Sequence, residues 1–145
     1  MKLLIINGPN LNLLGQREKG IYGERTFESY LEELRGRFPG VTIDCYQSNS
    51  EGSLVKRIHK ARGVYDGIVY NPGAHTHYSY ALRDAVSSID VPTVEVHLSD
   101  ISSREDFRKV SVIAPVCIAQ IKGKGFAGYE EAILLLKEYV QGRRV

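Results

Sequence analysis

The sequence has few cysteines, little net charge and no long hydrophobic run. With 19 Lys and Arg against 17 Asp and Glu, the formal net charge is +2, too small to favour nucleic acid or an anionic membrane as a partner. No apolar stretch approaches the roughly 18 residues that a membrane-spanning helix requires. Met1, Lys2 and Leu3 lead directly into a strand-like run, without the pattern of a signal peptide.

The two cysteines, Cys45 and Cys117, both lie in apolar, strand-like runs. We interpret them as buried small hydrophobic side chains rather than as a disulfide or a metal-binding pair. This usage is typical of a reducing compartment, so we expect a cytoplasmic location. Repeats and low-complexity linkers are absent, and 145 residues with 43% hydrophobic content predict a single domain, residues 1–145, with one core.

Five short apolar runs alternate with helical patterns. The expected strands cover residues 2–7, 41–46, 67–71, 93–98 and 116–121, and the expected helices cover residues 26–38, 52–62, 78–88, 103–109 and 129–140. This alternation predicts an α/β fold in which helices cover both faces of a parallel sheet. Five strands in this length suit the flavodoxin-like three-layer sandwich of strand order 2-1-3-4-5, whose switch point lies between the first and third strands.

The first expected strand stops abruptly at Asn7-Gly8-Pro9-Asn10, four residues that favour turns. The third strand ends in a similar way, at Asn71 followed by Pro72-Gly73. Ligands of open α/β sheets bind at the carboxyl ends of the strands, beside the switch point. We therefore expect a site between these two loops, with the end of the fourth strand beside it.

The loop of residues 15–23 carries Arg17 and Tyr22 among three glycines. A tyrosine with a pKa of about 10 is a poor base at neutral pH. An arginine about 4 Å away supplies roughly 4 kcal/mol at an effective dielectric near 20, enough to lower that pKa by about two or three units. Arg17 could therefore make Tyr22 a usable base. An exposed loop with an incidental arginine and tyrosine is the alternative that spacing alone leaves open.

Alternation places Glu95, His97 and Ser99 on one side of the fourth strand. A central parallel strand is normally apolar on both faces, so two ionisable side chains there need a reason. Glu95 can orient the imidazole of His97 and favour its protonated form, which makes His97 a candidate general acid. Ser99 and the backbone after it could bind an anion. An edge strand with one wet face would explain the same pattern without catalysis.

Two histidines, His75 and His77, follow the third strand. No nearby cysteine or carboxylate completes a set of metal ligands, so hydrogen bonding of a hydroxylated substrate by Asn71 and His77 is favoured over a metal pair.

Asp84 and Arg108 are further candidates on helices. Asp84 lies seven residues after His77, about 10.5 Å along a helix at 1.5 Å per residue, too far to share one small substrate with it. Asp84 could face a neighbouring subunit's site, or it could be a solvated helix carboxylate. Arg108 could reach the crevice, or it could pair at the surface with Glu105 or Asp106.

Several ordered motifs together resemble type II 3-dehydroquinate dehydratases. They are Gly8-Pro9-Asn10-Leu11-Asn12-Leu13-Leu14-Gly15 followed by Arg17 and Tyr22-Gly23, then residues 47–52, 71–74, 76–77, 81–85, 94–99 and 113–116. The resemblance covers nearly the whole chain with matching spacing, and such a series is far more specific than any one motif.

This resemblance implies a hydro-lyase that eliminates water anti from 3-dehydroquinate, through an enolate, to give 3-dehydroshikimate. It implies no metal and no organic cofactor, and a homo-oligomer in which trimers assemble into a dodecamer. Such an activity serves either the shikimate pathway, and through it chorismate and aromatic amino-acid biosynthesis, or quinate metabolism. The sequence leaves that choice open.

The resemblance also implies the catalytic roles. By analogy, Tyr22 removes the proton beside the ketone and Arg17 stabilises its phenolate. Asn10 positions a water or donor for the enolate oxygen. His97 protonates the departing hydroxyl, and Glu95 orients it.

Substrate-binding roles follow in the same way. Asn71, His77 and Arg108 match residues that hold the substrate hydroxyls. Leu98 and Ser99 match the site for the carboxylate.

Asp84 matches a residue that an adjacent subunit contributes, which agrees with the distance argument. The sequence departs from the family pattern at His75, where tyrosine is usual, and at Ser50, where histidine is frequent. Tyr78 and Tyr80 replace smaller residues. His75, Tyr78 and Tyr80 could alter substrate affinity or subunit contacts.

A flavodoxin-like fold could instead bind flavin mononucleotide without lyase activity. That alternative expects a hydroxyl-rich phosphate loop after the first strand, where this chain has Gly8-Pro9-Asn10-Leu11-Asn12 with no Ser or Thr. A serine hydrolase using His97 and Ser99 would need a Gly-x-Ser-x-Gly elbow, which the sequence lacks.

Overall fold

The computed structural model describes residues 1–14, 25–101 and 105–143. Its strands are β1 (Lys2–Asn7), β2 (Thr42–Gln47), β3 (Gly67–Asn71), β4 (Thr93–His97) and β5 (Ala119–Lys122). They pair in parallel in the order β2-β1-β3-β4-β5, which confirms the predicted flavodoxin-like sheet.

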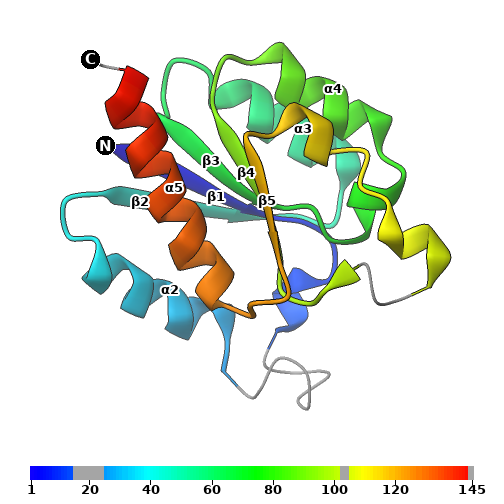
Figure 1. The fold of residues 1–145 in the computed structure, drawn as a ribbon, viewed down its shortest axis with the longest axis horizontal. Helices are drawn as coiled ribbons and strands as arrows, with labels where there is room; N and C mark the ends of the chain where they lie inside the picture. Colours follow the sequence, from blue (N-terminus) through cyan, green and yellow to red (C-terminus); the bar gives the residue numbers. More distant parts are fainter. Residues whose placement is uncertain (15–24, 102–104, 144–145) are drawn as a thin grey trace.

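Helices cover both faces of the sheet (Figure 1). The α-helices are α2 (Phe27–Arg37), α3 (Glu51–Lys60), α4 (Tyr80–Ser88) and α5 (Ala127–Arg143), and the short 3-10 helices include η1 (Leu11–Leu13), η2 (Gly73–His77), η4 (Asp106–Lys109) and η5 (Ala114–Val116). Alternation along β1 divides its side chains between two apolar layers. Leu3 and Ile5 pack with α2 and α5, whereas Leu4 and Ile6 pack with α3 and α4.

Three helices begin at a hydroxyl side chain. Thr26, Ser50 and Ser79 stand at the N-caps of α2, α3 and α4, and each accepts a hydrogen bond from the backbone N–H three residues on. Such caps satisfy amide groups that the first helical turn leaves without a partner.

Several predicted boundaries differ from the structure by a few residues, and two of the errors have local reasons. The third long helix begins at Tyr80 rather than at residue 78, because η2 precedes it and Ser79 caps it. The last strand begins at Ala119 rather than at residue 116, because Pro115 starts the tight turn η5. The short helix predicted from residue 103 appears as η4, and residues 102–104 lie outside the described residues.

The two cysteines are free and half-buried, so the prediction that they are buried small hydrophobic side chains is only partly right. Cys45 packs against the layer of α2 and α5, and Cys117 packs against the opposite layer. Cys117 also precedes β5 instead of lying within it.

The ends of β1 and β3 approach each other closely. Asn7 pairs with Asn71 in the sheet register, and the Gly8 N–H donates to the Asn71 carbonyl at 2.8 Å. A Cβ atom on Gly8 would lie 2.6 Å from the Pro72 carbonyl oxygen. Glycine is therefore required here, because any side chain would force the two loops apart.

Candidate active site

A cavity of about 260 Å³ lies at the carboxyl ends of β1, β3 and β4. Its lining residues are Pro9, Asn10, Leu11, Leu14, Asn71, Gly73, Ala74, His77, His97, Leu98, Ser99, Ile101 and Arg108. The cavity is thus at the switch point of the sheet, where sequence reasoning placed the site.

Most of the predicted site residues meet at this cavity. Those that line it are Asn10, Asn71, His77, His97, Leu98, Ser99 and Arg108. Glu95 lies behind His97 and contacts it. Asp84 is exposed on α4 and does not line the cavity. Arg17 and Tyr22 lie outside the described residues, so their proposed roles rest on the sequence.

The centre of the site is a buried pair of ionisable side chains. His97 is 5% exposed, Glu95 is 0% exposed, and the imidazole Nε2 hydrogen-bonds to Glu95 Oε2. Because β4 lies between β3 and β5, the edge-strand explanation of this pair is wrong. Burial raises the pKa of Glu95, but hydrogen bonds from His97, Gln120 and Thr76 outweigh it and hold the pKa below its ordinary value.

Asn71 is oriented by Tyr129, a residue that sequence reasoning missed. The Asn71 Nδ2 donates to the Tyr129 hydroxyl at 3.1 Å, and its Oδ1 accepts from the Gly73 N–H at 3.2 Å. The Tyr129 hydroxyl in turn donates to Asn7 Oδ1 at 2.7 Å. Among the described residues, one Nδ2 hydrogen of Asn71 has no partner and remains for a ligand in the cavity. A tyrosine on the inner face of the last helix was the available signal, since a buried hydroxyl needs a partner.

Asn10 stands at the mouth of the cavity in a left-handed conformation, with φ of 70°. Asparagine is one of the few residues that adopt this conformation readily. The Asn10 N–H donates to Asn49 Oδ1 at 2.9 Å, and Gln47 Nε2 donates to the Gly8 carbonyl at 3.2 Å. The last residue of β2 and the loop after that strand thus hold the loop after β1 in place.

His77 and Arg108 approach from the other side of the cavity. The His77 Nδ1 donates to the Val110 carbonyl at 2.8 Å, which leaves Nε2 as an acceptor in the neutral ring. The Arg108 Nε lies 2.7 Å from Glu105 Oε2. Arg108 therefore both lines the cavity and forms the surface pair that the sequence offered as an alternative.

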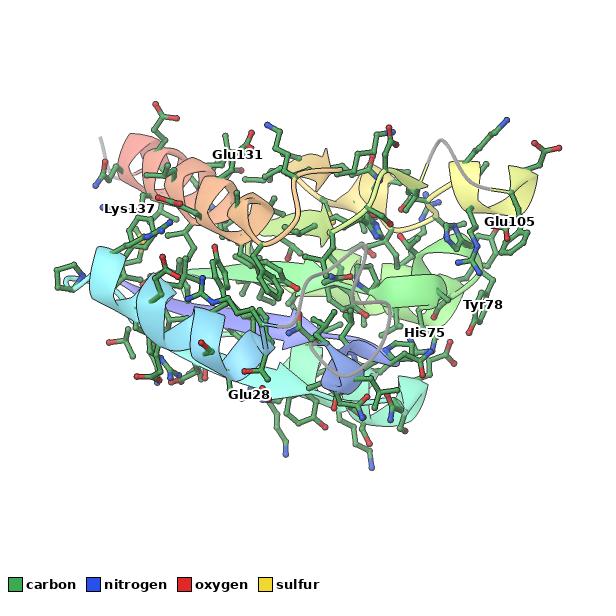
Figure 2. All side chains as sticks on the ribbon, turned by 90° about the horizontal axis from the view of Figure 1, so that it is seen from below. Glu28, His75, Tyr78, Glu105, Glu131 and Lys137 are labelled. Atoms are coloured by element: carbon green, nitrogen blue, oxygen red, sulfur yellow. The ribbon has the colours of Figure 1, made fainter. Side chains whose placement is uncertain are left out.

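The residues that depart from the family pattern lie away from the cavity lining. His75 is 6% exposed, and its ring meets the Tyr78 ring edge-on with centroids 5.7 Å apart. Figure 2 shows both residues toward the end of the molecule opposite Lys137, with Glu105 at the same end. Tyr78 and Tyr80 are largely exposed. None of the three is among the residues that line the cavity.

The described part of the chain has neither a cluster of metal-ligating side chains nor a membrane-spanning helix. In residues 1–14, 25–101 and 105–143, no three His, Cys, Asp or Glu side chains gather as metal ligands. Across the same residues, no helix has the length and apolar character needed to cross a membrane.

Comparison with known proteins gives one consistent result. The sequence profile described as dehydroquinase class II matches residues 1–137. A 3-dehydroquinate dehydratase of Anoxybacillus flavithermus is 53% identical over 146 residues, covering 99% of this chain and 98% of that protein. One from Pelotomaculum thermopropionicum is 60% identical over 132 residues, covering 89% and 91%.

Solved structures agree with the sequence comparison. The crystal structure of a type II dehydroquinase from Butyrivibrio crossotus matches with a TM-score of 0.90 and 48% identity, covering 94% of this chain and 97% of that one. The profile match, the relatives and the shared fold together show that this chain belongs to the class II dehydroquinase family.

Proposed function

We propose that this protein is a hydro-lyase that removes water from 3-dehydroquinate to give 3-dehydroshikimate. The observation that carries the proposal is the buried His97–Glu95 pair, which stands at a cavity lined by the residues that resemble the family's motifs. Relatives named 3-dehydroquinate dehydratase, 50–60% identical to this chain, support the same activity. The flavin-binding alternative has no such support.

The elimination divides into two proton transfers. The phenolate of Tyr22, stabilised by Arg17, takes the proton from the carbon beside the ketone, and the electron pair of that C–H bond forms an enolate. Asn10 places a donor at the enolate oxygen. The enolate then expels the hydroxyl, whose C–O bond breaks as protonated His97 gives it a proton, and water leaves. A proton must return from Tyr22 to His97, directly or through solvent, before the next turnover.

The binding roles follow from the groups that face the cavity. The remaining Nδ2–H of Asn71 can donate to a substrate hydroxyl, and Nε2 of His77 can accept from one. Arg108 adds a positive charge and further donors. Leu98 and Ser99, directly after β4, supply backbone N–H groups and a hydroxyl for the substrate carboxylate.

The assembly and the setting are also part of the proposal. We propose that residues 1–145 form one catalytic domain, that trimers build a dodecamer, and that Asp84 serves an adjacent subunit's site. The exposed position of Asp84, away from its own cavity, supports that role.

We propose that the enzyme needs no metal or organic cofactor. We place it in the cytoplasm, which the free cysteines support, and in the shikimate pathway, with quinate breakdown as the other use of the same reaction.

The proposal is tested by mixing the purified protein with 3-dehydroquinate and following the absorbance of the enone product. We expect turnover that survives borohydride treatment, because no lysine Schiff base takes part, and that is lost in Tyr22→Phe. Tyr139→Phe, an exposed tyrosine on α5, is the matched control and should keep the wild-type rate. A folded protein that leaves the substrate unchanged, or that copurifies with flavin, would contradict the proposal.

A further inference from the structure

Three side chains that do not line the cavity hold the Glu95 carboxylate in place. Thr76 Oγ1 donates to Glu95 Oε2 at 2.8 Å, and Gln120 Nε2 donates to the same oxygen at 3.0 Å. Ser111 Oγ lies 2.9 Å from Oε1 and 3.0 Å from Oε2. These residues come from η2, from the segment before η5 and from β5. Three separate parts of the chain therefore converge on one buried carboxylate.

The direction of these hydrogen bonds can be worked out at Ser111. Its oxygen accepts from the backbone N–H groups of Ile113 at 3.2 Å and Ala114 at 3.0 Å. Both lone pairs are then used, so the Ser111 hydroxyl proton has to be donated. Its possible acceptors are Glu95 and the Thr76 oxygen 2.7 Å away, and Thr76 itself donates to Glu95. In either case, the pair of hydroxyls acts as a hydrogen-bond donor to the Glu95 carboxylate.

Glu95 is thus surrounded by donors. The Gln120 amide nitrogen can only donate, and the imidazole nitrogen that faces Glu95 is its remaining partner. A carboxylate with this surrounding is most stable as an anion, despite its burial.

Few other titratable groups act on Glu95. Among the described residues, Tyr70 and Cys117 also interact with it electrostatically. Burial raises the pKa of Cys117 to about 12 and raises the pKa of Tyr70 as well, so both stay neutral near pH 7. Among the described residues, His97 is therefore the titratable group whose protonation is coupled directly to the charge of Glu95.

We propose that Thr76, Ser111 and Gln120 are positioning residues for the elimination. They hold Glu95 as an anion with Oε2 turned to the Nε2 of His97, so that Nδ1 is the imidazole nitrogen left for a ligand. The inference rests on the proposed function, because the positioned group is the proposed acid. A fixed carboxylate partner selects one tautomer and one ring orientation, which a proton donor to a departing hydroxyl requires.

Steady-state kinetics with 3-dehydroquinate test the inference. Gln120→Met and Ser111→Ala each remove a donor without touching the cavity, so each should lower kcat about tenfold, the loss of one hydrogen bond to a charged group, and leave KM within about twofold. Gln141→Met and Ser88→Ala remove an exposed amide on α5 and a hydroxyl at the end of α4, and should leave kcat unchanged.

A double-mutant cycle separates positioning from general damage. In a Glu95→Gln background, the two substitutions should cost little further kcat, because their effect passes through the ionised carboxylate. Losses that simply multiply in that background, or a rise in KM that accounts for the effect, would overturn the inference.

Urea unfolding gives a second readout that needs no turnover. The stability lost in Gln120→Met should be present at pH 7 and should shrink as the pH falls through the lowered pKa of Glu95, where the carboxylate takes up a proton. An equal loss at every pH would indicate packing alone and would overturn the inference. Absence of wild-type turnover would overturn the proposed function itself, whereas wild-type turnover with unchanged kcat in both variants would overturn only the positioning role.

Discussion

Removal of one hydroxyl, in Tyr129→Phe, should destabilise this protein although the buried ring is kept. Tyr129 is 0% exposed, and its hydroxyl joins Asn7 to Asn71 through bonds of 2.7 and 3.1 Å. Each such bond contributes about 1 kcal/mol, and each buried partner left without one costs about 1–3 kcal/mol. We therefore expect the free energy of unfolding to fall by about 2–4 kcal/mol, since solvent from the cavity can reach Asn71 and relieve part of the cost.

Tyr70→Phe is the matched control for this prediction. Tyr70 is also 0% exposed, but its hydroxyl has no hydrogen-bond partner among the described residues. The control should leave stability unchanged or slightly raise it, because a buried hydroxyl without a partner is replaced by hydrogen.

The measurement is urea unfolding of both variants at one protein concentration. With a slope of about 2 kcal/mol per molar urea, the midpoint of Tyr129→Phe should fall by about 1–2 M at unchanged slope. The KM for 3-dehydroquinate should also rise, because Asn71 loses the group that orients it. Equal midpoints for Tyr129→Phe and Tyr70→Phe would refute the reasoning.

Three further predictions concern charge, backbone and assembly. The lowered pKa of Glu95 contributes stability that is present above its ordinary pKa of 4.5 and is lost as the pH falls through the lower pKa of the folded protein. In urea unfolding between pH 3 and pH 7, Glu95→Gln should therefore reduce the dependence of the free energy of unfolding on pH. Gly8→Ala should lower the free energy of unfolding by about 1–3 kcal/mol, because its Cβ would lie 2.6 Å from a carbonyl oxygen. Gly36→Ala, whose Cβ would have nothing within 4 Å, should raise the free energy of unfolding by about 0.5–1 kcal/mol in the same measurement. Asp84→Asn should lower kcat/KM roughly tenfold although Asp84 lines no part of its own cavity, and an unchanged value would contradict a site shared between subunits.

Much of the fold could be predicted because turn residues mark the ends of the site-forming strands. β1 and β3 end where Asn7 and Asn71 meet Gly-Pro and Pro-Gly sequences, and both boundaries were correct. The errors at α4 and β5 came from short 3-10 helices, η2 and η5, which have too few residues to give a periodic signal.

The candidate site was predictable where its residues are local to a strand end. His97 and Glu95 are two residues apart on one strand, so alternation alone brought them together. The partners of Glu95 and of the strand-end asparagines could not be found in that way. Gln120 reaches Glu95 across 25 residues, and Tyr129 reaches Asn7 across 122 residues, so both contacts exist only through the tertiary fold.

The most direct test of the account is the rate of enone formation from 3-dehydroquinate by the wild-type protein and by His97→Asn. A general acid contributes about 10²–10⁴ in rate, so we predict steady wild-type turnover and a loss of at least about 100-fold in kcat for the variant, with KM little changed. A His97→Asn protein that kept most of the wild-type rate would contradict the assignment of the buried His97–Glu95 pair as the acid that completes the elimination.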